Sequence, residues 1–325
     1  MLTIKAFYDN KALQDITHMC KSIQISGDVS QVARKLDITM AYPITDSNQP
    51  RFQVGTGTLV TVFEDNKEIY RGFVQDREIN SGNQEVVFTA YDYLIYLLKS
   101  KVTYNFSDIN SEYAVEKICS DLGLKYNWIP QTGIKINRLI QNMSAYEAIM
   151  EIYTQVSKID GQRYYPYADY DMLSVMGKGK LVDDIVLSSL TNINATSYKD
   201  TTSNMVNKII VYDENNYWVG EVANAADVKY YGVFQDIYQK EEDKDWRTVA
   251  NNMLHGRDIE INVTALGNYR CKTGWAVRVK IPYVDILADT VMYIDTDTHT
   301  WNVATGMHTM DLKLNLNNVM DLKED

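Results

Sequence analysis

The amino-acid sequence predicts an α+β fold that is mainly β, with two antiparallel β-domains bracketing a small α/β insert of helices and a hairpin. Two blocks of alternating apolar and polar residues predict the β-domains, and helical spacing between them predicts the insert. We expect the first β-domain to span residues 1–105, the insert 106–180 and the second β-domain 181–325, since 325 residues are enough for three such parts.

The C-terminal block, from Asn262 to Leu316, carries the strongest strand pattern. Val277 and Val279 alternate with polar neighbours, Gly274 precedes them and Pro282 follows. A further alternating run of apolar residues comes near the end of the chain, at Met310, Leu312, Leu314 and Leu316. This pattern predicts strands with one apolar face and one solvent-exposed face. The apolar face must pack against another surface.

A looser copy of this plan lies near the N-terminus. Gly57 precedes an alternating strand from Leu59 to Phe63, polar turn residues follow, and further strands are expected at Ile69–Val74 and Glu85–Ala90. Because both blocks place a glycine before an alternating strand and end in an apolar strand, we interpret them as two copies of one small β-domain. That inference rests on the order of patterns and not on residue identity.

Two helices and a hairpin are predicted for the insert. Ser111 is expected to cap a helix that ends at Gly123, and Ser144 with Glu147 forms a capping box for a second helix that stops near Gly161. The tyrosine-rich segment 163–176 is typical of a hairpin.

The second β-domain is predicted to contain an inserted helix. Apolar residues from Trp246 to Leu254 form one stripe, which indicates a helix near 241–256. The polar stretch from Thr191 to Asp200 is predicted to be a loop.

Composition excludes several classes of protein. With 43 acidic and 32 basic residues the formal charge is −11, which argues against a surface that grips nucleic acid. No apolar stretch approaches the roughly 20 residues of a membrane helix, and no signal peptide is visible. Three dispersed cysteines fit synthesis in a reducing cytoplasm, without a disulfide framework.

One cluster could hold a metal ion. Asp295, Asp297 and His299 alternate with threonines, and His308 follows nine residues later. Carboxylates and imidazoles are metal ligands, but fewer than four firm ligands are present, and repeated Thr and Asp are also typical of a turn. We therefore predict a solvated turn and assign no metal, cofactor or catalytic residue.

Other catalytic patterns are missing from the sequence. There is no nucleophile elbow, zinc-protease helix or paired-cysteine motif, and the segment Gly177–Lys180 lacks the rest of a phosphate-binding loop. Paired carboxylates could be chosen almost at will among 43 acidic residues, so they do not indicate a glycosidase. We expect a protein that is not an enzyme.

The order of motifs resembles the baseplate hub proteins of contractile phage tails and phage-tail-like bacteriocins, the XkdQ-type family. The motifs that carry the resemblance are Gly57-x-Leu59-Val60-x-Val62, Ile69–Val74, Asp92-Tyr93-Leu94, Leu122-Gly123-Leu124, Ser144-x-x-Glu147, Thr298-His299 and Met307–Leu312. The likeness covers essentially the whole chain, and its motifs are structural.

The resemblance implies a homotrimer in which each chain supplies two tube-like β-domains, so that three chains form a ring of six. Such a hub connects the six-fold tail tube to the three-fold central spike, and its expected partners are the tube, spike, tape measure and baseplate wedge proteins. An acidic channel wall would not hold DNA. The alternatives are a cell-wall (peptidoglycan) hydrolase and a glycan-binding tail component that uses the 24 tyrosines.

Overall fold

The computed structural model describes residues 2–7, 13–44, 48, 52, 54–241 and 245–323. The chain is mainly β, with 52% of residues in strands and 17% in helices, which confirms the predicted fold class. It divides into a main unit, Met1–Thr196 with Asn262–Asp325, and a small unit, Ser197–Ile261. No helix in the described part of the chain is long and apolar enough to cross a bilayer.

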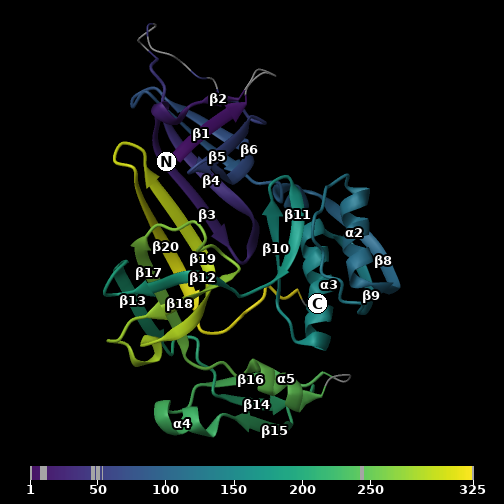
Figure 1. The fold of residues 1–325 in the computed structure, drawn as a ribbon. Helices are drawn as coiled ribbons and strands as arrows, with labels where there is room; N and C mark the ends of the chain where they lie inside the picture. The colour runs from purple at the N-terminus through teal and green to yellow at the C-terminus, as the bar shows by residue number, and fades with distance from the viewer. Residues whose placement is uncertain are drawn as a thin grey trace. The chain divides into compact units, whose positions relative to one another are not determined.

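A first lobe of antiparallel strands opens the main unit (Figure 1). Its strands lie in the order β2-β1-β5-β6-β7-β4-β3. Alternation turns Leu36, Ile38 and Met40 of β4 inward, and the lobe encloses its own apolar core. The strands are β1 (Leu2–Phe7), β2 (Gln14–Asp15), β3 (Cys20–Asp28), β4 (Gln31–Ala41), β5 (Leu59–Glu64), β6 (Lys67–Asn80) and β7 (Glu85–Tyr91).

The middle of the chain forms two strand pairs, β8 with β9 and β10 with β11, and three helices that share a second apolar core. The predicted capping box is confirmed, since Ser144 accepts a hydrogen bond from Glu147 N, and Gly161 ends the helix with φ 74°. The predicted cap at Ser111 is wrong, because Asn110 is the N-cap and Ser111 is the first residue of the helix. The elements are α1 (Ile95–Lys99), β8 (Lys101–Asn110), α2 (Ser111–Asp121), β9 (Lys135–Ser144), α3 (Ala145–Asp160), β10 (Tyr164–Asp169) and β11 (Met172–Gly177).

A second lobe follows, with the strand order β13-β17-β20-β19-β18-β12. Its strands are β12 (Lys180–Ser188), β13 (Ile193–Thr201), β17 (Asp258–Leu266), β18 (Trp275–Lys280), β19 (Thr290–Asn302) and β20 (Met307–Asn315). The predicted loop at Thr191–Asp200 is wrong, because most of that polar stretch is strand β13. Its polar residues suit a strand with much exposed surface.

The two lobes share one strand order. We number the six strands of each lobe 1 to 6 in chain order: β1, β3, β4, β5, β6 and β7 in the first lobe, and β12, β13, β17, β18, β19 and β20 in the second. In both lobes the strands then lie side by side in the order 2-3-6-5-4-1. β2 has no counterpart, and β12 pairs with β18 in parallel where β1 pairs with β5 antiparallel. The boundaries 1–105, 106–180 and 181–325 stay a prediction.

Two local details recur at equivalent places in the lobes. Gly57 and Gly274 both have positive φ, of 81° and 90°, which glycine adopts without strain. Each donates its N–H to the fifth strand of its lobe, at Val74 O and Ile294 O. Directly after each acceptor, β6 and β19 shift register against β7 and β20.

The lobes join edge to edge into one continuous sheet. Strand β19 pairs with β18 through Thr290–Tyr293 and with β3 through Thr296–Asn302, while β20 pairs along its other side. Figure 1 shows β3 beside β19, at the centre of this sheet. The second half of β19 is therefore the seam between lobes.

The small unit is inserted between β13 and β17, where the first lobe has only the turn between β3 and β4. Its three-stranded sheet, β15-β14-β16, packs on α5 around Ile209, Val211 and Ala250. The helix predicted near 241–256 is α5. The elements are β14 (Lys208–Tyr212), β15 (Trp218–Ala223), α4 (Ala225–Tyr231), β16 (Gln235–Gln239) and α5 (Trp246–Met253).

Candidate functional site

Three of the four candidate residues meet inside the seam. Asp297 and His299 lie in β19 with no exposed surface, and His308 lies beside them in β20. The predicted solvated turn is wrong. The segment is a regular strand with a partner on each side, so alternation turns both side chains inward.

Asp295 lies apart from the other three. The register shift between Ile294 and Thr296 interrupts the alternation and turns Asp295 toward Lys178, whose Nζ lies 2.8 Å from Oδ1. Asn315 donates a second hydrogen bond to the same carboxylate. Asp295 thus holds the segment that enters the second lobe and does not belong to the cluster.

Asp297 forms a buried ion pair with Arg34 of β4. Nη1 donates to Oδ1 at 2.8 Å and Nη2 to Oδ2 at 2.5 Å, the two-pronged geometry that guanidinium favours. Thr273 donates two more hydrogen bonds to Oδ1, from its backbone N and its hydroxyl, each at 2.6 Å. The ion pair therefore connects the second lobe to the first.

Electrostatics keep this pair charged. Burial opposes ionisation of Asp297, but the charge and N–H groups of Arg34 outweigh it and hold the carboxyl pKa below its usual value. Burial likewise acts to lower the pKa of Arg34, and Asp297 outweighs it, so that pKa lies well above its usual value.

Two histidines extend the network from Asp297. His299 Nε2 lies 2.9 Å from the carbonyl oxygen of Cys271, which can only accept, so this nitrogen carries the proton. His299 Nδ1 is then an acceptor, and His308 Nε2 donates to it at 3.0 Å. Burial lowers the pKa of His299 to about 4, so the ring is neutral near pH 7.

Glu64 of β5 completes the network. Its Oε1 accepts from Trp301 Nε1 at 3.2 Å and lies 3.3 Å from His308 Nδ1. The two ring nitrogens of His308 thus lie beside His299 Nδ1 and Glu64 Oε1, and the ring stacks on Trp301. The hydrogen bond from His308 is the largest cause of a lowered pKa at Glu64. We call Arg34, Glu64, Asp297, His299, Trp301 and His308 the junction network.

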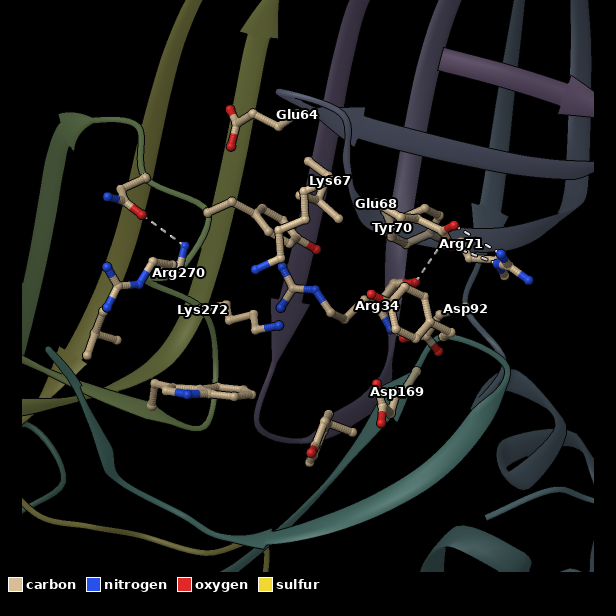
Figure 2. A pocket seen from close by; sticks show the side chains of 18 of the residues that line it. Arg34, Glu64, Lys67, Glu68, Tyr70, Arg71, Asp92, Asp169, Arg270 and Lys272 are labelled. Carbon is tan, nitrogen blue, oxygen red and sulfur yellow. Dashed lines mark hydrogen bonds and ion pairs between the residues drawn. The ribbon is translucent and has the colours of Figure 1, made fainter. Parts of the chain in front are cut away.

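A pocket of about 710 Å³ borders the junction network within the main unit. Figure 2 shows Arg34 and Lys272 beside each other in it, with Glu64 and Lys67 from the β5–β6 hairpin further along the wall. The remaining walls come from the turn between β10 and β11, the start of β12 and the segment 268–275. The side chains that line the pocket include both basic and acidic residues.

Comparison with known proteins places the chain in a family. The family model described as YQBQ-like matches residues 23–315. The chain belongs to the YQBQ-like family. Two relatives from Bacillus subtilis (strain 168) are similar over 90% of this chain: the uncharacterized protein YqbQ, 24% identical and covered to 91%, and the phage-like element PBSX protein XkdQ, 23% identical and covered to 92%.

Solved structures show the same fold. The 43 kDa tail protein of prophage MuSo2 from Shewanella oneidensis matches with a TM-score of 0.73 at 14% identity, over 97% of this chain and 98% of that one. The family match and the similarity to XkdQ confirm the predicted resemblance to XkdQ-type proteins.

In this YQBQ-like chain the junction network fixes two lobes together. Both nitrogens of His299 are engaged, and the described residues contain no group of three or more metal-ligating side chains. Trp301 and Tyr269 of the second lobe also pack into the core of the first. The arrangement is suited to a rigid connection between sheets.

Sequence reasoning missed Arg34, Glu64 and Thr273. Arg34 is 263 positions from Asp297, and no local pattern marks it as a partner. The one available signal was the alternation of Asp297 and His299, which indicates a shared face once the segment is taken as a strand.

Proposed function

We propose that this protein is a structural hub of a phage-type contractile tail baseplate, acting by assembly and catalysing no reaction. The full-length similarity to the PBSX protein XkdQ and the fold shared with a prophage tail protein support the baseplate role. The observation that carries the hub role is the shared strand order of the two lobes.

Two equivalent lobes in each chain allow three chains to close a ring of six. Within the chain, the second half of β19 pairs with β3 of the first lobe. By strand order, β6 of the first lobe corresponds to β19, and β13 of the second lobe corresponds to β3. Pairing β6 of one copy with β13 of the next would repeat the same junction between copies.

Both of these edges are available in the described chain. Strand β5 pairs with β6 only as far as Phe73, and the later residues of β6, Gln75–Asn80, are exposed. Strand β13 has β17 as its only partner among the described strands. Unpaired edges invite a further strand, and mutual pairing would protect both from aggregation. Three contacts within chains and three between chains would then alternate around the ring.

A six-lobed trimer would connect a six-fold tail tube to a three-fold spike. On this proposal the partners are the tail tube, central spike, tape measure and baseplate wedge proteins, and the chain is made in the bacterial cytoplasm before it joins the particle. The net charge of −11 would keep a channel wall from binding DNA.

Native mass spectrometry tests the hub proposal. The purified chain is measured alone and with the spike protein of the same tail, and a mass of three chains is expected in at least one condition. A lasting monomer in both conditions would contradict the proposal.

Nothing in the described chain favours peptidoglycan hydrolysis or glycan binding over assembly. The carboxylates of Asp297 and Glu64 both accept hydrogen bonds within the junction network, and Asp297 has no exposed surface that a polymer could reach. A zymogram on peptidoglycan provides the check. Clearing that disappears when one carboxylate is removed would favour the hydrolase.

A further inference from the structure

Strand β6 exposes the positions that are buried in the second half of β19. Counted from the register shift in each strand, Arg77 of β6 stands at the position of Asp297 in β19. Two residues later, Ile79 stands at the position of His299. The two residues of β19 have no exposed surface, whereas Arg77 is exposed and Ile79 is 44% exposed. The positions that close the seam within the chain are therefore open in the first lobe.

Both side chains lie on the core side of the first lobe. Arg77 pairs with the buried Phe88 of β7. Ile79 pairs with Val86, which is buried as well. Residues directly opposite in an antiparallel pair share one face of the sheet. Strand β5 pairs with β6 only as far as Phe73, so no described strand lies beside Ile79 on that edge. The open edge therefore has an isoleucine on its core side and lacks a covering surface.

Arg77 reverses the charge found at this position in the closed seam. There Asp297 is held by Arg34, which the first lobe supplies from β4. Arg77 donates from Nη1 to Val54 O at 2.8 Å and forms no ion pair among the described residues. A first lobe that docked on β6 as it docks on β19 would bring Arg34 toward Arg77, and like charges at an interface repel. The reversed charge therefore selects against a first lobe as the covering surface.

The second lobe has an apolar residue where the first lobe has Arg34. The third strands of the lobes align on three alternating buried residues in each, Leu36, Ile38 and Met40 in β4 and Ile261, Val263 and Ala265 in β17. The alignment also matches Thr39 with Thr264, each of which contacts the same position in the last strand of its lobe. Two residues before the first buried one stands Arg34 in β4 and Ile259 in β17. A second lobe docked on β6 would therefore bring an isoleucine, and no guanidinium, to this place.

We propose that Arg77 and Ile79 are the docking surface for the second lobe of a neighbouring copy, whose Ile259 takes the place that Arg34 holds in the closed seam. This inference rests on the trimer proposed above, and it adds which side chains close the second seam and why a first lobe does not fit there. Ile79 supplies apolar surface to the contact. Arg77 already donates to a backbone carbonyl, so its stem can cover apolar surface while the guanidinium stays at the rim.

Sedimentation velocity of the full chain, alone and with the spike protein of the same tail, tests this surface. In the condition where the wild type forms trimers, Ile79→Asp is expected to raise the concentration for half-assembly by roughly tenfold or more. The control Ile159→Asp makes the same change on α3, at a side chain that is 67% exposed, and is expected to leave assembly unchanged. Because Ile79 is exposed in the single chain, both variants are expected to melt like the wild type where it is monomeric.

A charge exchange tests whether the second lobe is the occupant. Ile259→Arg gives the second lobe the guanidinium of the first, and like charge with Arg77 is expected to weaken assembly by roughly tenfold or more. Adding Arg77→Asp recreates the pair of opposite charges found in the closed seam and is expected to recover most of that loss. If Ile79→Asp melts below the wild type, this recovery alone decides.

The outcomes separate this surface from the trimer itself. A wild type that stays monomeric in both conditions overturns the trimer and this surface together. Trimers that Ile79→Asp and Ile259→Arg leave unchanged overturn the surface and leave the trimer standing. So does an Ile259→Arg chain that Arg77→Asp fails to recover, because the two side chains then do not face each other.

Discussion

Asp297 is the residue on which the junction network depends most. It accepts hydrogen bonds from Arg34 and Thr273 and balances the charge of Arg34, whose side chain is only 12% exposed. The pair contributes little net stability compared with an apolar core, but breaking it leaves a buried charge unpaired. Loss of one partner is therefore expected to cost far more than loss of a surface pair.

The substitution Asp297→Asn keeps the shape and removes the charge. We expect it to lower the free energy of unfolding by about 3–5 kcal/mol, because the Arg34 charge stays buried. Urea unfolding measures this. The control Asp289→Asn breaks an exposed pair with Arg278 and is expected to cost far less than Asp297→Asn. Equal losses in the two variants would show that Asp297 and Arg34 interact as a surface pair does.

The pH dependence of stability is predicted from His299. Its pKa is about 4 in the folded chain, below the ordinary 6.5, so between these values the unfolded chain binds more protons. Stability is therefore fully present above pH 6.5 and falls as the pH drops toward 4, by roughly 2–3 kcal/mol at pH 4.5. Urea unfolding at pH 6.5 and at pH 4.5 should show this loss of stability in the wild type. In His299→Gln most of the difference in stability between the two pH values should disappear. His18→Gln serves as control, and identical slopes in all three proteins would refute the assignment.

At the scale of elements, β3 leaves room for the ion pair between Arg34 and Asp297 because Gly27 has no side chain. Gly27 lies opposite Asp297, and an added Cβ would lie 2.3 Å from Nη1 of Arg34 and 3.0 Å from Oδ1 of Asp297. The guanidinium is fixed by its two hydrogen bonds, so it cannot move away without breaking the ion pair.

Gly27→Ala is therefore expected to destabilise the chain by about 1–3 kcal/mol, the usual cost of overpacking. Thermal unfolding measures the change. The matched control is Gly55→Ala, where an added Cβ meets nothing within 4 Å, and it should stay within about 0.5 kcal/mol of the wild type. If the Gly27→Ala chain is as stable as this control, the Arg34 side chain can move away from the added methyl group without loss of stability, which contradicts the prediction.

Local signals predicted the elements that local chemistry determines. The capping box at Ser144, the helix end at Gly161 and the glycine before β18 depend on neighbours in sequence, and each is confirmed. The polar stretches that became β13 and the second half of β19 were wrongly predicted, because their turn-like residues are held by partner strands. Arg34 and Glu64 could not be linked to Asp297 and His308, since only the fold brings them together.

At the scale of the whole molecule, the repeated lobe is the main feature. The same strand order, the paired glycines Gly57 and Gly274, and the register shifts in β6 and β19 recur, while the residues around them differ. One seam, β19 with β3, is closed inside the chain, whereas among the described strands β6 and β13, which correspond to β19 and β3, are not paired with each other.

Zero-length carbodiimide cross-linking of a mixture of ¹⁴N- and ¹⁵N-labelled chains, after assembly, tests this seam most directly. Lys199 in β13 and the carboxylates Asp76 and Glu78 in β6 are suited to the reagent. Mass spectrometry is expected to find peptides in which residues 75–80 of one isotope are joined to residues 193–201 of the other. An assembled trimer whose mixed-isotope cross-links all lie outside these two strands would contradict the account.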